Sequence, residues 1–315
     1  MNRFRKGVVS ILPVLVVLII VYLLGYKFKN QLPSFFLRPT PTESASSTPT
    51  DSSTPSPTPT PVTIKTPTPK PVTTISPAPV ISNAPPGAGY SRQSVSSDAG
   101  VFTVSMIAAD ISSTRVIVDT ASPGDCSNNC PVLSLGDYVV RNGAYAGING
   151  SYFCPADYSS CSGKTNTFDT LLMNKDKVYF NSANNVYSNN PAVIFGGGYI
   201  RFVGAASEWG RDTGIDSMIS NYPLLLAGGN ITFGGDDDPK KGSKGSRSFV
   251  ANKGNNVYIG VVHSATVAES ARVMKALGFE NALNLDNGGS TALYSGGYKV
   301  GPGRALPNVI LFVKR

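Results

Sequence analysis

A long stretch rich in proline, threonine and serine limits how much of this 315-residue chain can fold. It runs from about Pro39 to Pro86 and repeats Thr-Pro pairs, as in Thr58-Pro59-Thr60-Pro61. Such a composition buries too little apolar surface to offset the entropy that a chain loses when it becomes ordered. We therefore predict a disordered stalk over residues 39–89 and one globular domain over residues 90–315, which is large enough for an ample core.

A hydrophobic run precedes the stalk. Gly7 to Gly25 is almost entirely apolar, follows the basic start Arg3 to Lys6, and is long enough to cross a bilayer. The next segment, Tyr26-Lys27-Phe28-Lys29, lacks the small residues of a signal-peptide cleavage site. We predict that residues 1–38 form a short cytoplasmic tail, an uncleaved transmembrane anchor and a juxtamembrane segment, with the globular domain outside the cytoplasm. A cleaved signal peptide is the alternative.

The formal net charge of +8 is concentrated in front of the globular domain. Residues 1–86 contain eight Lys or Arg and two Asp or Glu, so they carry +6 and leave +2 for the rest of the chain. A nearly neutral domain lacks the basic surface that nucleic-acid binding requires. We therefore predict no nucleic-acid partner.

All four cysteines lie within one region of the predicted domain. An even number of cysteines in an extracytoplasmic domain favours disulfide bonds. We predict local pairing of Cys126 with Cys130 and of Cys154 with Cys161. A zinc site with four thiolate ligands is the alternative, although these spacings differ from the tight pairs that are usual in such sites.

The globular part contains many short strands and few helices. Ser134 to Asn142 is predicted to be a short helix closed by Gly143, and a capping box at Thr266 opens a second helix that runs to Leu277 and stops at Gly278. Strand-like runs rich in β-branched residues are 101–107, 115–119, 144–148, 192–195, 199–203, 223–227, 247–251, 256–262, 282–285 and 308–313. This pattern predicts an α+β domain with a mixed, curved β-sheet and few helices.

One loop combines an acid, glycines and hydroxyls at the end of an apolar strand. It is the segment Asn284-Leu285-Asp286-Asn287-Gly288-Gly289-Ser290-Thr291-Ala292-Leu293. Glycines let a backbone approach a ligand closely, and successive N–H groups together with two hydroxyls suit phosphate or sugar oxygens. Asp286 supplies the charge that a reaction needs.

Three further segments carry polar side chains beside a strand. They are Ala146 to Phe153, which contains Asn149; Gly245 to Ala251, which contains Arg247; and Gly301 to Asn308, which contains Arg304. An arginine fork fits phosphate or carboxylate groups. Each segment also has an ordinary structural interpretation: an Asn-Gly turn, a solvated arginine at a strand end, and a hairpin loop.

These four segments, in this order, resemble the phosphodiester glycosidase family, and the likeness runs from about Val101 to the C-terminus. The acid loop is similar to the family's Asn-Leu-Asp-Gly-Gly-Gly-Ser-Thr. Ile148 to Phe153 is similar to its Ile-Asn-Gly-Gly-Phe-Phe, Ser246-Arg247-Ser248 to its Pro-Arg-Thr, and Arg304 to Asn308 to its closing Arg-x-x-Pro-Asn. Asn287 departs from the pattern because it stands at the first glycine; asparagine tolerates a left-handed backbone better than most residues.

The resemblance implies hydrolysis of a sugar that is joined through its anomeric carbon to a phosphodiester. Asp286 and Arg247 are the predicted catalytic residues, with Asp286 as nucleophile, base or stabiliser of the oxocarbenium ion. The second carboxylate is left open between Glu208 and Glu269, although Glu269 also belongs to the capping box. The predicted substrate-binding residues are Asn149, Asn284, Gly288, Gly289, Ser290, Thr291, Arg304 and His263. Of these, Arg304, Ser290 and Thr291 are expected to hold phosphate together with Arg247. The two asparagines are expected to orient sugar hydroxyls or the loop itself.

Other functions receive less support from the sequence. A serine hydrolase would need Ser290 with His263, the one histidine of the chain, but no Gly-x-Ser-x-Gly elbow surrounds Ser290. The acidic run Asp236-Asp237-Asp238 is predicted to be a solvated hairpin tip, because its spacing fits no known calcium loop. We expect no cofactor and no protein-bound metal, and leave a requirement for a divalent cation open.

The resulting hypothesis is a membrane-tethered hydrolase acting on a glycosyl phosphodiester in a cell-surface or wall glycopolymer. Its predicted partners are that phosphate-bearing glycan and, through the N-terminal helix, the membrane. The alternative from a different class is a non-catalytic module that binds wall or surface glycans.

Overall fold

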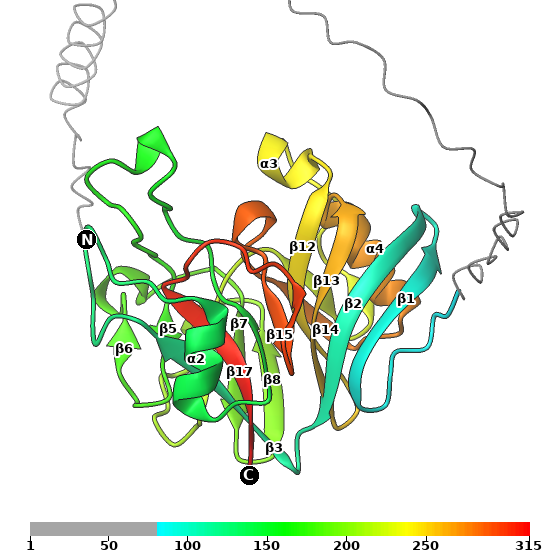
Figure 1. Cartoon of the computed structure of the whole chain (residues 1–315), viewed down its shortest axis with the longest axis horizontal. Helices are drawn as coiled ribbons and strands as arrows, with labels where there is room; N and C mark the ends of the chain where they lie inside the picture. The colour runs from blue at the N-terminus through cyan, green and yellow to red at the C-terminus, as the bar shows by residue number, and fades with distance from the viewer. Residues whose placement is uncertain (1–80) are drawn as a thin grey trace, which may run out of the picture. The chain divides into compact units, whose positions relative to one another are not determined.

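The computed structural model describes residues 81–315 (Figure 1). The predicted anchor and most of the predicted stalk lie outside the described residues. Within residues 81–315, the helices are all too short or too polar to span a bilayer. The described part is mostly β-structure arranged in three sheets, as the abundance of strand signals predicts.

The largest sheet carries the acid loop. Its seven strands, in spatial order, are β1 (Gly89–Ser97), β2 (Gly100–Asp110), β13 (Asn256–Ala265), β12 (Gly245–Lys253), β14 (Asn281–Asn284), β10 (Leu224–Ala227) and β11 (Asn230–Ile231). Both faces of this sheet are buried: Phe249 of β12 packs into one hydrophobic cluster and its neighbour Val250 into another. Because successive side chains of a strand point to opposite faces, the central strands are continuously apolar instead of alternating.

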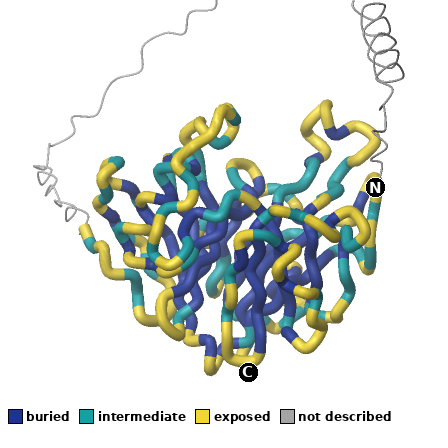
Figure 2. Tube along the Cα trace, turned by 180° about the vertical axis from the view of Figure 1, so that it is seen from behind, coloured by how far each residue is buried: buried dark blue, intermediate teal, exposed yellow. Residues whose placement is uncertain are grey.

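Two five-stranded sheets complete the fold. One has the order β16 (Tyr298–Val300), β15 (Leu293–Ser295), β4 (Ala146–Asn149), β17 (Asn308–Lys314) and β3 (Thr114–Thr120). The other has the order β6 (Tyr179–Phe180), β5 (Leu172–Met173), β9 (Ser217–Ser220), β7 (Ala192–Gly196) and β8 (Tyr199–Val203). Val250, Ile310 and Ile219, one from each sheet, belong to the same buried cluster. Buried residues fill the interior between the sheets (Figure 2, dark blue).

Three α-helices occur in the described residues: α2 (Leu135–Asn142), α3 (Pro239–Gly242) and α4 (Val267–Ala276). Short 3-10 turns are η1 (Ser159–Cys161), η2 (Ala183–Asn185), η3 (Ala206–Glu208) and η4 (Gly288–Ser290). The predictions for α2 and α4 are confirmed. Ser134 caps α2 and Gly143 closes it with φ 58°, while Thr266 and Glu269 form the capping box of α4.

The prediction of a mixed sheet is wrong in its strand pairing. Every pair of named neighbouring strands is antiparallel. Strands β13 and β14 are parallel to each other, but β12 lies between them and pairs with both. Helix α4 connects these two strands and packs across the sheet against β1, β10 and β13. Its Val273 and Met274 belong to the same cluster as Phe249.

The predicted disulfides are confirmed. Cys126 is bonded to Cys130, and Cys154 to Cys161. The second bond closes a short loop that contains Asp157 and Tyr158. Disulfides persist in oxidising compartments, so this pair of bonds indicates an extracytoplasmic domain.

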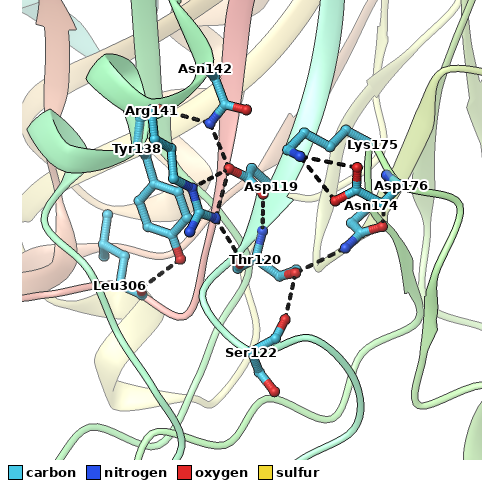
Figure 3. Close-up of polar contacts among 10 residues, drawn as sticks. All are labelled: Asp119, Thr120, Ser122, Tyr138, Arg141, Asn142, Asn174, Lys175, Asp176 and Leu306. Carbon is cyan, nitrogen blue, oxygen red and sulfur yellow. Dashed lines mark hydrogen bonds and ion pairs between the residues drawn. The ribbon is translucent and has the colours of Figure 1, made fainter.

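A polar network fastens α2 to the end of β3 (Figure 3). The buried carboxylate of Asp119 accepts hydrogen bonds from Arg141 Nε at 2.7 Å and Asn142 Nδ2 at 2.6 Å, and from the Thr120 N–H at 2.9 Å. Thr120 Oγ1 in turn accepts from Asn174 Nδ2 at 3.0 Å. These groups line an open hollow of about 500 Å³, but they bond to one another, so the network stabilises the fold.

We expect Asp119→Ala to lower the free energy of unfolding by about 2–3 kcal/mol, because it leaves one arginine and two N–H donors without their buried acceptor. Urea unfolding measures the change. The control is Asp176→Ala in the same hollow, whose carboxylate is 60% exposed and whose ion pair with Lys175 is worth less than about 1 kcal/mol. Equal effects of the two substitutions would contradict a structural role for Asp119.

Candidate active site

Backbone hydrogen bonds hold the acid loop between two strand ends. After β14 ends, Leu285 N donates to Ser248 O at 2.9 Å, and Asp286 N donates to Gly150 O at 2.9 Å. The loop then turns at Gly288, whose φ is 62°. Asn287 has φ −127°, so the left-handed backbone that we considered for it belongs to Gly288 instead. The asparagine at the family's first glycine therefore causes no backbone strain.

Asn149 ties the loop to its neighbours. It is fully buried, and its Nδ2 donates to Asp286 O at 2.7 Å. Its Oδ1 accepts from Ser248 Oγ at 2.9 Å and from the Ala292 N–H at 3.2 Å. These contacts orient the loop, which is one of the two roles predicted for Asn149.

The Asn-Gly pair of this segment is explained by close packing against β17. A Cβ at Gly150 would lie 1.9 Å from Asn308 Oδ1 and 2.7 Å from Asn308 O, so only glycine fits there. Asn308 Oδ1 also accepts the N–H of Ser151 at 2.9 Å. Asn308, from the closing Arg304 to Asn308 segment, therefore positions the chain just before Tyr152.

A cavity of about 450 Å³ lies beside the acid loop. It is lined by Tyr152, Phe153, Tyr158, Tyr222, Asp238, Lys240, Lys241, Ser243, Lys244, Gly245, Arg247, Asp286, Asn287 and Gly288. The wall carries three lysines and one arginine but only two carboxylates, so its formal charge is positive. The cavity therefore favours an anionic ligand and also presents aromatic surface to it.

Asp286 is the most perturbed acid of the site. Its side chain belongs to a residue that is only 9% exposed, and burial raises the pKa of Asp286 to about 7. A hydrogen bond from Ser290, the N–H of Asn287 at 2.8 Å, and the charges of Arg304 and Lys240 oppose that rise. A carboxyl group that titrates near neutrality is suited to acid–base or nucleophilic chemistry.

Arg247 is buried without an acidic partner. It is 5% exposed, its Nε donates to Ala265 O at 2.9 Å, and its Nη2 donates to Lys240 O at 3.0 Å and to Ser243 O. Arg247 takes part in none of the ion pairs among residues 81–315. Burial lowers the pKa of Arg247, but an arginine remains charged, so its positive charge is available to an anion in the cavity.

Ser290, Thr291 and Arg304 support the loop rather than line the cavity. Arg304 Nη1 donates to Ser290 Oγ at 3.1 Å, and its Nη2 pairs with Asp157 at 2.6 Å. The same guanidinium passes so close to Gly289 that a Cβ there would lie 2.8 Å from it. Thr291 is buried with its hydroxyl 3.5 Å from that of Ser248. Of the predicted site residues, only Asp286, Arg247 and Gly288 belong to the cavity wall.

His263 is not brought to this cavity. Its Nε2 lies 2.9 Å from Ser105 Oγ on β2, which pairs with β13 on the side opposite β12. Burial lowers the pKa of His263. Since Ser290 bonds to Arg304 and His263 bonds to Ser105, the triad of a serine hydrolase is not assembled.

Of the acidic run only Asp238 lines the cavity. Asp236 and Asp237 are exposed, as predicted, but the run leads into helix α3 instead of forming the tip of a hairpin. Asp238 caps α3 by accepting the Lys240 N–H at 2.9 Å, and Pro239 occupies the first turn. An Asp followed by Pro is a helix-start signal that the sequence contains and that we did not use. Lys240 lies 4.8 Å from the centre of the Tyr158 ring, and Lys241 lies 5.7 Å from that of Tyr222.

Neither glutamate proposed as a second carboxylate lines the cavity. Glu269 Oε2 accepts the Thr266 N–H at 2.7 Å, and its Oε1 pairs with Lys244. Glu208 belongs to η3, whose neighbours are in the third sheet. In the described structure the second carboxylate of the cavity wall is Asp238.

Comparisons with known proteins identify the family of this chain. A model described as phosphodiester glycosidase matches residues 142–313. The catalytic domain of zebrafish N-acetylglucosamine-1-phosphodiester alpha-N-acetylglucosaminidase, auto-inhibited by pro-peptide, has a similar structure, with a TM-score of 0.56, 17% identity, and coverage of 72% of this chain and 83% of that one. No curated protein matches the sequence.

A hypothetical protein from Synechocystis has a similar structure, with a TM-score of 0.50 and 14% identity over 72% of this chain. The match covers 62% of that protein, so this chain spans less than two thirds of its length. At these identities the two structures show a shared fold. The family model, by contrast, matches the sequence itself and covers both the acid loop and the segments with Arg247, Arg304 and Asn149. Because that match spans more than half of the chain, this protein belongs to the phosphodiester glycosidase family.

Proposed function

We propose that this protein hydrolyses a glycosyl phosphodiester, using Asp286 at the sugar and Arg247 at the phosphate. One observation carries the proposal: a buried carboxyl group with a pKa of about 7 and a buried arginine without an acidic partner line the same cavity. The first group suits the positive charge that develops on the sugar ring, and the second suits the negative charge of the departing phosphate. Family membership supports the same reaction.

The reaction breaks the bond between the anomeric carbon and the phosphate oxygen. The electron pair of that bond leaves with the phosphate, and water supplies the hydroxyl group that remains on the sugar. A phosphate ester is a good leaving group, so stabilising its charge matters more than protonating it. Arg247 performs that stabilisation in our proposal, while ionised Asp286 stabilises the oxocarbenium-like sugar or attacks it.

The cellular substrate in this proposal is a surface or wall glycopolymer with a phosphate-linked sugar. Three features support it: the predicted anchor, the predicted stalk and the two disulfides. A semi-extended stalk of about 50 residues at about 3 Å each would place the domain on the order of 100 Å from a membrane. That distance suits a polymer beyond the lipid surface.

The test is incubation of the protein with a panel of glycosyl phosphodiesters, including UDP-N-acetylglucosamine, in water enriched in oxygen-18. A glycosidase places the heavy oxygen on the released sugar, whereas a phosphodiesterase places it on phosphate. We expect label on the sugar alone. Binding without product would favour a glycan-binding module, and neither binding nor cleavage would show that the substrate class is wrong.

We assign the second carboxylate of the reaction to Asp238, and we expect Asp238→Asn to lower kcat about a hundredfold. Asparagine caps a helix as well as aspartate does, so α3 should keep its start while the cavity loses a charge. Steady-state kinetics measure the effect, and circular dichroism checks the fold. Asp236→Asn, which removes a neighbouring acid outside the cavity wall, is the control. Wild-type turnover by Asp238→Asn would leave Asp286 as the one carboxylate in the mechanism.

A further inference from the structure

The hydroxyl oxygen of Tyr152 receives two hydrogen bonds from amides of the acid loop. Asn284 Nδ2 lies 2.7 Å from it, and Asn287 Nδ2 lies 3.1 Å from it. A tyrosine oxygen has about two acceptor positions and one proton to donate. With both acceptor positions filled, the proton must point elsewhere, and Tyr152 lines the cavity.

The orientation of both amides is fixed by their other partners. Asn287 Oδ1 accepts the N–H of Ser248 at 2.9 Å, and a backbone N–H can only donate. Asn284 Nδ2 also lies 3.0 Å from Tyr222 O and 2.9 Å from Leu285 O, and carbonyl oxygens can only accept, so its two hydrogens are shared among these carbonyls and Tyr152. Each asparagine must therefore turn its NH₂ group toward Tyr152. The Tyr152 oxygen therefore accepts from both asparagines, and its own proton is not donated to either of them.

Within residues 81–315, every hydrogen bond of the Tyr152 hydroxyl is one that it accepts. Burial, and then the nearby charge of Asp286, raise the pKa of Tyr152, so the hydroxyl keeps its proton at neutral pH. A protonated donor and a buried cation thus face the same cavity as Asp286.

We propose that Tyr152 is a catalytic hydrogen-bond donor, which together with Arg247 binds a phosphate oxygen of the departing group, and that Asn287 positions it. The inference rests on the proposed function and adds a residue to it. Both positions depart from the family segments quoted above: Tyr152 stands at a phenylalanine and Asn287 at a glycine. The two departures contact each other, and together they supply a hydroxyl donor and the amide that orients it.

Tyr152→Phe removes the hydroxyl and keeps the ring. We expect it to lower kcat ten- to a hundredfold with little change in KM, because the donor acts mainly on charge that develops in the transition state. The loss should shrink for substrates with a more acidic leaving phosphate, which need less stabilisation. Tyr145→Phe is the matched control, because Tyr145 also has a hydrogen-bonded hydroxyl, to Thr114 at 2.7 Å, but lies outside the cavity wall.

The double variant separates positioning from direct contact. Asn287→Gly should lower kcat about tenfold by itself, but should have little effect when Tyr152 is already phenylalanine, because a positioning residue has nothing left to orient. Additive losses would show that Asn287 acts independently of Tyr152. Wild-type kcat in Tyr152→Phe, for every leaving group, would overturn the donor role.

Binding of inorganic phosphate, measured by calorimetry, keeps this inference separate from the proposed reaction. We expect Tyr152→Phe to weaken phosphate binding about tenfold, the usual cost of losing one hydrogen bond to a charged group. If wild-type protein binds phosphate but cleaves no glycosyl phosphodiester, the proposed function fails while the donor role is judged on affinity alone. Unchanged affinity in the variant, or no phosphate binding by the wild type, would overturn the inference.

Discussion

Asp286→Asn is expected to lower turnover of a glycosyl phosphodiester at least about a thousandfold, while leaving the protein folded. The amide keeps the size of the carboxyl group and can still accept the Asn287 N–H, but it can neither attack a sugar carbon nor offset its positive charge. Discontinuous sugar-release assays at high enzyme concentration measure the residual rate. A loss of less than about tenfold would remove Asp286 from the chemistry.

The pH dependence of the wild type follows from the same carboxyl group. Because the proposed roles need the ionised form, kcat/KM should rise about tenfold per pH unit below pH 7 and level off above it, in line with a pKa of about 7. A rate that falls as pH rises through 7 would show that Asp286 works as an acid. Asp286→Asn should show no such inflection.

The same substitution should stabilise the fold at alkaline pH. Burial raises the pKa of Asp286 from 3.8 to about 7, so the folded state binds more protons than the unfolded state between those values. Stability therefore falls as pH rises through that window and is lowest above pH 7, by up to about 4 kcal/mol for a rise of about three units. Asparagine carries no charge, so the variant avoids this loss.

Urea unfolding at a series of pH values measures this difference. The variant should exceed the wild type in unfolding free energy at pH 8, and the two should converge near pH 4. Asp119→Asn is the matched control, since that buried carboxylate pairs with Arg141 and should lose stability on neutralisation. A wild type that is more stable than Asp286→Asn at pH 8 would mean that the ionised carboxylate stabilises the fold.

Local signals in the sequence were enough to find the elements around the site. The capping box of α4 and the glycine after α2 are short-range features whose partners lie within a few residues, and both are confirmed. The disulfide pairs are equally local. The acid loop was recognisable because its residues follow one another, and the structure does place Asp286 in a cavity wall.

The remaining features depend on contacts between distant segments. Asp238 and Lys240 reach the cavity because Arg247 bonds to the carbonyl of Lys240, which no local pattern reveals. Arg304, predicted to bind phosphate, pairs with Asp157 and Ser290 instead and so supports the acid loop. His263 lies near the end of β13, but its side chain bonds to Ser105 on β2, away from the cavity. Each of these contacts depends on how side chains meet in the folded chain, which no pattern in a single sequence reveals.

Arg247→Lys is expected to lower kcat/KM at least about a hundredfold, although the charge is kept. The guanidinium uses Nε and Nη2 to bond Ala265 O, Lys240 O and Ser243 O, and these bonds aim the rest of the planar group at the cavity. A lysine ammonium has no such fork, so it can satisfy the carbonyls or face the phosphate but cannot do both. Arg201→Lys, at an exposed arginine that donates to Glu208 O at 3.2 Å, is the control.

Arg247→Ala separates the two roles of this arginine. It leaves three backbone carbonyls without their donor, so we expect a loss of about 2–3 kcal/mol in unfolding free energy as well as a loss of activity of about a thousandfold. Added guanidinium ion should restore part of the activity, because it returns a planar cation to the cavity without restoring the covalent link. Rescue of turnover without rescue of stability would assign the phosphate contact to the charge itself. If neither variant loses more activity than Arg201→Lys, Arg247 only anchors the segment that contains α3, and the phosphate must be bound by the lysines of that segment.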